Sequence, residues 1–366
     1  MGAGHSGNDH SNYSSQNTLP SQPRQILETS FITSFSVSYS ESIPPKSRSS
    51  HFTVYFPDHD VAVIGYGISD NNEVFNDIWS INFQTKSWAQ FPIDTSSVSP
   101  RSGSTAVAVG NKIYVFGGLY NSQYFSDLHI IDLQSKTITH PTLSNPNSQP
   151  PGRIGHVMGY ADGKIAIWGG FNGSFLKDLW IYEINTSKWV KMPCDAQGRA
   201  DAAFATCNDN LYIIGASNSD AIFKYNIPNP RNMEVITPTG NPPPYDLKGA
   251  MMVAVDRYLV FIGGKLENKR YALIRAFDTV KCWWFVLYVA PDGKTTTMYD
   301  GKIDQNGMFM VPRIYNGSIV YRQKKREVVV FLGKPQIDPP SLNVISIGDA
   351  LSYLSMRSDM LTMLSL

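Results

Sequence analysis

Short hydrophobic runs that end in glycine recur along the chain about every 50 residues. Before each glycine, two β-rich runs flank a polar turn pair, as in residues 104–109 and 113–116 around Asn111-Lys112. Such a pattern predicts a β-hairpin. The glycines are Gly65, Gly117, Gly118, Gly169, Gly170, Gly215, Gly263, Gly264 and Gly333. A fixed period of this size predicts a fold built from stacked copies of one supersecondary unit.

Two further strands follow each hairpin. The third begins just after an aspartate such as Asp77 or Asp178, and a bulky residue recurs at a fixed distance beyond it. Turn-forming residues separate the two, so the second bulky residue begins a fourth strand. The bulky pairs are Ile81 and Trp88, Ile131 and Ile138, Tyr182 and Trp189, and Phe277 and Trp284. Each unit is therefore predicted to be a four-stranded antiparallel meander.

An arginine recurs ahead of the first strand, and prolines cluster just before it. The arginines are Arg48, Arg101, Arg153, Arg199 and Arg313. Because aspartates such as Asp77 and Asp178 repeat in the same way, we interpret them as hydrogen-bond acceptors that fix loops. Trp88, Trp189 and Trp284 are expected to fill the wedges between neighbouring sheets, where a buried aromatic side chain contributes most.

A diglycine after a hydrophobic strand, an aspartate before the next strand and a spaced aromatic pair together resemble the kelch repeat. The resemblance covers about residues 45–350 and is fullest over residues 152–193. It implies an all-β fold, a six-bladed β-propeller of four-stranded antiparallel blades, with seven blades as the alternative. The recurring glycines, arginines and tryptophans, including Arg101 and Arg153, would then be structural.

The ring of blades is expected to close through the N-terminal part of the chain. Residues 31–39 place Phe35, Val37 and Tyr39 on one face of a strand, which predicts the outer strand of the last blade. The predicted organisation is a leader over residues 1–24, a propeller over 25–350 and a C-terminal tail over 351–366. The segment from Asp349 onward has no clear period and is an alternative outer strand or a short terminal helix.

The charge balance excludes one class of partner. Lys and Arg total 31 against 30 acidic residues, so we expect no electrostatic attraction of nucleic acid.

The three cysteines, Cys194, Cys207 and Cys282, lack metal-ligand spacing and suit a reducing compartment. No apolar run reaches the roughly 18 residues of a membrane span. A cytoplasmic location is therefore expected.

The histidines offer little sign of chemistry. All seven lie within the first 156 residues, and no His-x-His, His-Glu-x-x-His or Cys-x-x-Cys motif is present. We therefore expect no metal, cofactor or catalytic residue, and interpret His51 and His156 as structural because they occupy equivalent repeat positions. The favoured function is a non-catalytic module that binds another protein as an adaptor or scaffold. The alternative is a kelch-type enzyme acting on a sugar, either an isomerase or an oxidase.

The loops between second and third strands and those that join consecutive blades are expected on one face of the propeller. They vary among the copies, and such loops commonly carry function. They contain Tyr120 and Tyr124 in one copy and Phe171 and Phe175 in the next. Aromatic side chains of this kind anchor protein interfaces, so these four residues are predicted to bind a partner. Packing of each loop on itself is the alternative interpretation.

The N-terminal sequence carries a separate signal. Met1-Gly2 followed by Ser6 fits the pattern for N-myristoylation at Gly2. One myristoyl chain gives a membrane association constant of only about 10⁴ M⁻¹. Weak contact with a membrane, at the periphery, is therefore expected only if Gly2 is modified.

Overall fold

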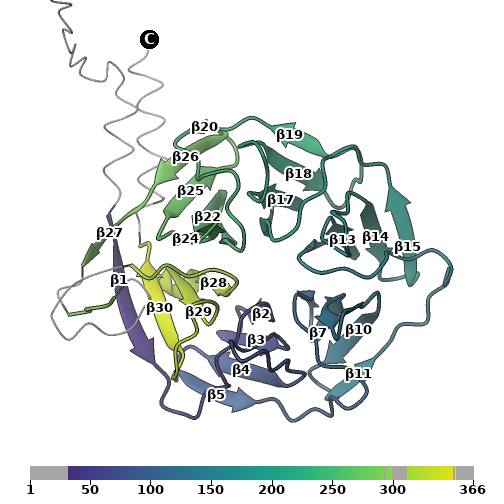
Figure 1. The fold of residues 1–366 in the computed structure, drawn as a ribbon, viewed down its shortest axis with the longest axis horizontal. Helices are drawn as coiled ribbons and strands as arrows, with labels where there is room; N and C mark the ends of the chain where they lie inside the picture. Colours follow the sequence, from purple (N-terminus) through teal and green to yellow (C-terminus); the bar gives the residue numbers. More distant parts are fainter. Residues whose placement is uncertain (1–31, 292–293, 299–310, 349–350, 352–366) are drawn as a thin grey trace, which may run out of the picture.

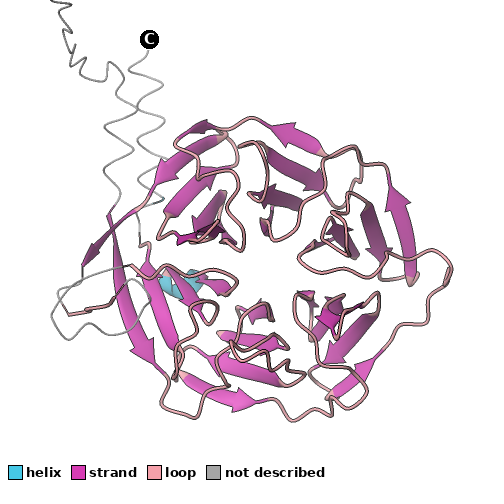
Figure 2. Ribbon diagram, in the orientation of Figure 1, coloured by secondary structure: helices cyan, strands magenta, loops and turns pink. Residues whose placement is uncertain are grey.

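The computed structural model describes residues 32–291, 294–298, 311–348 and Leu351. Six sheets stand as blades around a central axis and form a ring (Figure 1). Within the described residues between 32 and 348, all regular secondary structure is β-strand except for one 3₁₀ turn, η1 (Gln323–Lys325), which is drawn cyan in Figure 2. The predicted six-bladed, all-β propeller is confirmed. The leader over 1–24, including Gly2, and the tail beyond Leu351 lie outside the described residues.

The blades follow one another in chain order. Blade 1 contains β2 (Phe52–Phe56), β3 (Val61–Gly65), β4 (Ile78–Asn82) and β5 (Ser87–Gln90); blade 2 contains β6 (Thr105–Val109), β7 (Lys112–Phe116), β10 (Leu128–Asp132) and β11 (Thr137–Thr139); blade 3 contains β12 (Val157–Ala161), β13 (Lys164–Trp168), β14 (Leu179–Glu183) and β15 (Lys188–Met192). Blade 4 contains β16 (Ala203–Cys207), β17 (Asn210–Ile214), β18 (Ile222–Asn226) and β19 (Glu234–Ile236); blade 5 contains β21 (Met251–Val255), β22 (Tyr258–Ile262), β25 (Ile274–Asp278) and β26 (Trp283–Val286); blade 6 contains β28 (Ser318–Arg322), β29 (Glu327–Phe331), β30 (Ser341–Ser346) and β1 (Ile32–Tyr39). Two short hairpins lie in loops: β8 (Leu119–Tyr120) with β9 (Gln123–Tyr124), and β23 (Lys265–Leu266) with β24 (Lys269–Arg270).

The N-terminal strand closes the ring as predicted. β1 pairs antiparallel with β30 and places Phe35 opposite Ile345, so blade 6 combines the two ends of the propeller (Figure 1). Blades 5 and 6 differ from the prediction of four strands, because each gains a fifth. β27 (Tyr288–Pro291) pairs with β1, and β20 (Thr239–Gly240) pairs with β26, both parallel. These connecting segments cover edges that would otherwise be open.

A ring of backbone hydrogen bonds closes the propeller at its axis. One residue just before the innermost strand of each blade donates its N–H to the carbonyl of its counterpart in the preceding blade, at 2.8 to 3.4 Å. The residues are Ser50, Gly103, Gly155, Asp201, Gly249 and Asn316, and all have positive φ. Because the last bond runs from Ser50 to Asn316, the circle is complete.

The spaced bulky pairs lie in the third and fourth strands, as predicted, and face one another there. Tyr182 pairs with Trp189, and Phe277 pairs with Trp284. Trp189 is 1% exposed and packs edge-to-face on Phe116 of blade 2, with ring centroids 5.6 Å apart. Trp88 of blade 1 packs in the same way on Phe331 of blade 6, at 6.0 Å. The tryptophans thus fill wedges between blades, where burial of apolar area stabilises the stack.

Candidate functional site

In blades 1 to 3 a buried arginine ahead of the innermost strand pairs with the aspartate ahead of the third strand. Arg153 donates from Nη1 and Nη2 to the two carboxylate oxygens of Asp178, at 2.8 and 2.7 Å. Trp180 Nε1 also donates to Asp178 Oδ2, at 2.6 Å. Burial alone would raise the pKa of Asp178, but the bonds from Arg153 outweigh it and hold this pKa below its usual range. Arg48, Asp77 and Trp79 repeat the arrangement in blade 1. The interpretation of these aspartates as loop-fixing acceptors is confirmed.

The arrangement weakens in the later blades. Arg199 of blade 4 donates only to backbone carbonyls, including that of Gly215 at 3.3 Å, and burial lowers its pKa to about 10. Leu247 takes the arginine's place in blade 5, because its carbonyl accepts the equivalent bond, here from Ala216. In blade 6 Ile314 occupies this position, whereas Arg313 is exposed. The expectation that Arg313 is the equivalent arginine of blade 6 was therefore wrong by one residue.

The loops between second and third strands, and the connections between blades, emerge together on one face of the ring. This loop face comprises residues 66–77, 117–127, 169–178, 215–221, 263–273 and 332–340, with the connections 91–104, 140–156, 193–202 and 237–250. The hairpin turns within blades lie on the opposite face. All four predicted partner-binding residues lie on the loop face.

Three of these four residues form one aromatic cluster, made of Tyr124, Phe171 and Phe175. The Phe171 ring is flanked from both sides, by Tyr124 of blade 2 at 6.4 Å and by Phe175 of its own loop at 5.5 Å. Phe175 is 60% exposed, whereas Tyr124 and Phe171 are half-buried. Tyr120 stands apart, half-buried in the β8–β9 hairpin and paired through its backbone with Gln123.

Other parts of the loop face have a different character. Between blades 1 and 6 it carries ion pairs, Lys46 with Glu73 at 2.9 Å and Lys334 with Asp70 at 3.1 Å. Tyr245, in the connection from blade 4 to blade 5, is 53% exposed and was missed by the sequence reasoning. The available signal was its position directly after the proline run 242–244, in one of the loops that join consecutive blades.

The axis of the ring holds a small cavity of about 140 Å³. Its lining includes Ser50, Asp201 and Asn316 from the axial ring, together with His51 and His156. Burial raises the pKa of Asp201. His51 bonds to Ser318, and burial followed by the charge of Arg48 lowers the pKa of His51 to about 3. His156 bonds to Thr105 of blade 2 in the same way. Both imidazoles therefore bridge blades, in agreement with the structural role predicted for them.

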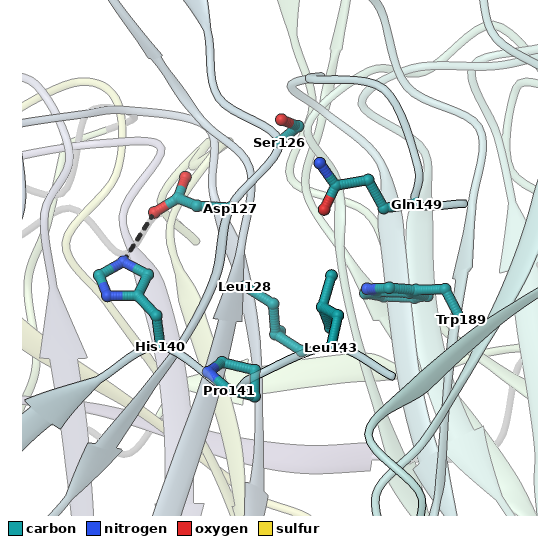
Figure 3. Close-up of a pocket in the computed structure, with 8 residues that line it drawn as sticks. All are labelled: Ser126, Asp127, Leu128, His140, Pro141, Leu143, Gln149 and Trp189. Carbon is teal, nitrogen blue, oxygen red and sulfur yellow. Dashed lines mark ion pairs between the residues drawn. The ribbon is translucent and has the colours of Figure 1, made fainter. Parts of the chain in front are cut away.

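A second cavity, of about 230 Å³, lies on the loop face at the border of blades 2 and 3. Asp127 and His140 face each other at one side of it, whereas Gln149 and Trp189 lie at the other (Figure 3). Among the described residues, Asp127, His129 and His140 are the one group of three potential metal ligands, with ligand atoms within 4.8 Å of one another. Motif spacing did not reveal this group, because His129 lies in β10 and His140 directly follows β11, so that only the β10–β11 hairpin brings them together. Within the described residues, no helix is both long and apolar enough for a transmembrane segment.

The fold, the spaced tryptophans and the arginine–aspartate pairs define a six-bladed propeller of the kelch type. The family model of the KLHDC2/KLHL20/DRC7 Kelch-repeats domain matches residues 27–216. This match covers more than half of the chain, and the protein belongs to the Kelch-repeat family.

Individual relatives are more distant. The chain is 31% identical over 197 residues to Tip elongation aberrant protein 1 of Schizosaccharomyces pombe, which covers 50% of this chain and 17% of that protein. It is 26% identical over 215 residues to Kelch domain-containing protein 10 of Homo sapiens, covering 52% and 47%. It is 27% identical over 245 residues to the N-(sulfonatooxy)prop-2-enimidothioate sulfolyase of Thlaspi arvense, covering 57% and 70%. The match therefore spans about half or less of the first two relatives.

Proposed function

We propose that this protein is an interaction module whose loop face binds another protein through the aromatic cluster of blades 2 and 3. The observation that carries the proposal is the edge-to-face packing of Tyr124, Phe171 and Phe175, which crosses the border between two blades and ends in a largely exposed ring. Aromatic side chains held rigidly at such positions dominate interface energetics because they bury a large area with little loss of side-chain entropy.

The rest of the loop face supports a defined contact area. In its ion pairs between blades 1 and 6, each charge is paired with an opposite charge and lies near solvent. Such pairs suit the polar rim of an interface better than its centre. Some kelch relatives, such as Kelch domain-containing protein 10, have names that denote no catalytic activity, and this supports binding over turnover as the function proposed here. An adaptor or scaffold role follows from this proposal.

The test is affinity purification of the full chain from native cells, followed by measurement of the recovered partner's affinity. Phe175→Ser is expected to weaken binding by about tenfold or more, since an anchoring aromatic is worth at least 1–2 kcal/mol. Val280→Ser is the matched control, because Val280 is 69% exposed but lies in a hairpin turn on the opposite face. Equal affinity of Phe175→Ser and the unaltered chain would reject this surface.

The enzyme alternative places a substrate in the axial cavity and predicts turnover that depends on Asp201, whose carboxylate lies there. A screen of sugars with the purified chain and with Asp201→Asn tests it directly. The sulfolyase relative is an enzyme by name, so N-(sulfonatooxy)prop-2-enimidothioate belongs in the same screen. Turnover lost in Asp201→Asn would favour this alternative over the interaction module.

We also propose that Gly2 is myristoylated and that the protein is cytoplasmic, with reversible recruitment to a membrane. The support is the N-terminal sequence alone. Mass spectrometry of the protein from its native cells is expected to find an acylated Gly2, and Gly2→Ala is expected to be recovered only in the soluble fraction. A free amine at Gly2 would remove this part of the proposal.

A further inference from the structure

The carboxylate of Asp127 is satisfied differently from its counterparts. In blade 3 Asp178 Oδ2 receives two hydrogen bonds, from Arg153 Nη2 and from Trp180 Nε1. In blade 2 Arg101 donates one bond, from Nη1 to Asp127 Oδ1 at 2.7 Å. The side chain at the tryptophan position is His129. Asp127 Oδ2 therefore lacks both of the donors that saturate the equivalent oxygen.

His129 brings an unsatisfied nitrogen to this oxygen. The side chain is fully buried, and its Nε2 lies 2.6 Å from the hydroxyl of Tyr66. Its Nδ1 lies 3.3 Å from Asp127 Oδ2, closed to solvent, and lacks a hydrogen bond of good geometry. A buried polar atom without a partner is costly, and this one points at a carboxylate oxygen that has room for another contact.

His140 supplies a third ligand atom. It follows β11 directly, where the register of β10 and β11 places it opposite His129, as Lys191 lies opposite Trp180 in blade 3. Its Nε2 lies 3.7 Å from Asp127 Oδ2 (dashed line in Figure 3). The side chain is 50% exposed, so it adjusts its position more readily than its two partners.

We propose that Asp127 Oδ2, His129 Nδ1 and His140 Nε2 form a binding site for a divalent transition-metal ion, with Zn²⁺ as the first candidate. Zinc bound by histidine and carboxylate at about 2.0–2.2 Å in tetrahedral geometry holds neighbouring ligand atoms about 3.4 Å apart. The observed separations of 3.3 and 3.7 Å from Asp127 Oδ2 surround that value.

The neighbouring groups suit a bound cation. Arg101 occupies the other carboxylate oxygen and leaves Oδ2 to the metal. When Nδ1 binds the ion, Nε2 of His129 carries the hydrogen and donates it to the Tyr66 oxygen, the kind of supporting bond that orients metal-binding histidines. The cavity beside His140 provides room for a water molecule as the fourth ligand.

The position of the site gives it a structural consequence. Asp127 lies three residues beyond Tyr124, and His140 begins the connection from blade 2 to blade 3. A metal ion would tie that connection to the start of β10 and so fix the segment that presents the aromatic cluster. The metal site itself is independent of the proposed partner binding.

The test is titration of the metal-free full chain with Zn²⁺ by calorimetry, and with Co²⁺ by visible absorption. One equivalent is expected to bind, and bound Co²⁺ is expected to show the intense bands of a four-coordinate site. His140→Ala is expected to abolish this equivalent while leaving the circular dichroism spectrum unchanged, because His140 is half-exposed. Tyr66→Phe is expected to weaken binding by about tenfold.

His59→Ala is the matched control, since His59 is an exposed histidine in a blade 1 turn on the opposite face. His59→Ala is expected to bind the same one equivalent of Zn²⁺ as the unaltered chain. Because His5 and His10 are present in both variants, any binding by them cancels when His59→Ala is compared with His140→Ala. Equal Zn²⁺ affinity in His140→Ala and the unaltered chain, or no binding at micromolar Zn²⁺, would overturn the proposal.

Discussion

Blades 2 and 3 are built on the same frame, yet their outer parts differ in character. Each has four antiparallel strands, a diglycine, and a buried arginine paired with an aspartate. Three positions in or directly after the two outer strands have changed. Blade 3 has Trp180, Trp189 and Lys191 where blade 2 has His129, Ile138 and His140.

The difference shows which residues hold the fold and which are free to vary. In blade 3 Trp180 donates a hydrogen bond to the aspartate, whereas Trp189 fills the wedge toward blade 2. In blade 2 His129 replaces the tryptophan that donates to the aspartate, and His140 lines a cavity beside Asp127. Since the frame persists in both blades, the frame positions the loops, and two of the changed residues, His129 and His140, belong to the metal site proposed for blade 2.

The largest expected difference in stability between the blades concerns the bulky residue of the fourth strand, which is Trp189 in blade 3 and Ile138 in blade 2. Trp189→Ala is expected to lower the free energy of unfolding by about 3–5 kcal/mol, because it removes a fully buried ring and leaves a cavity. Ile138→Ala, at the matching register position, is expected to cost less because Ile138 is only half-buried. Urea unfolding with an unchanged m-value measures both. Equal losses would show that the two wedges are equivalent.

The arginine–aspartate pair gives the next largest effect. Asp178→Asn leaves the fully buried Arg153 without its counter-charge and is expected to cost about 3 kcal/mol. Asp127→Asn is expected to cost less, because Arg101 makes only one hydrogen bond to that carboxylate. Thermal unfolding of the two variants side by side tests the ranking. A greater loss in Asp127→Asn would contradict the view that blade 2 has the looser arrangement.

The repeat was predictable from the sequence because its signals are local. Glycines after hydrophobic strands, turn pairs and spaced bulky residues each report a nearby backbone requirement, and their period gave six blades and the closing role of Phe35 and its neighbours. The misplaced Arg313 shows where this fails. Only the hydrogen bonds around the axis reveal that Ile314 takes the arginine's position.

The candidate sites were only partly predictable. Tyr124, Phe171 and Phe175 were identified by their loops, but their stacking depends on the contact between two blades. A search for motif spacing did not find the group at Asp127, because its histidines meet across a hairpin. The axial ring was not predicted, because Ser50, Asp201 and Asn316 adopt positive φ although they are not glycines. Each feature follows from register or closure, which local patterns do not encode.

The pH dependence of the free energy of unfolding gives a smaller difference between the blades. Burial, followed by the charge of Arg153, holds the pKa of His156 well below its usual range, so the unfolded chain takes up the proton first as pH falls below about 6.5. His156 therefore contributes stability above that pH, and the contribution is lost by about 1.4 kcal/mol per pH unit on acidification. His156→Gln is expected to reduce the slope of stability between about pH 6.5 and 4.5.

Blade 2 supplies the reference for this effect. Its equivalent position is Ser104, which does not titrate, so Ser104→Ala is expected to leave the slope unchanged while altering the absolute stability. Chemical denaturation at several pH values measures both slopes. An unaltered slope in His156→Gln would mean that the imidazole is not held neutral in the folded protein.

The smallest expected effect on stability belongs to the aromatic cluster, where the ranking of the blades reverses. Phe175→Ser is expected to change the free energy of unfolding by no more than about 0.5 kcal/mol, because its ring is largely exposed. Tyr124 stands at the same distance before its aspartate in blade 2 but is half-buried against Phe171, so Tyr124→Ser is expected to cost more. A large loss of stability in Phe175→Ser would assign that ring to loop packing and remove the basis for treating it as a partner anchor.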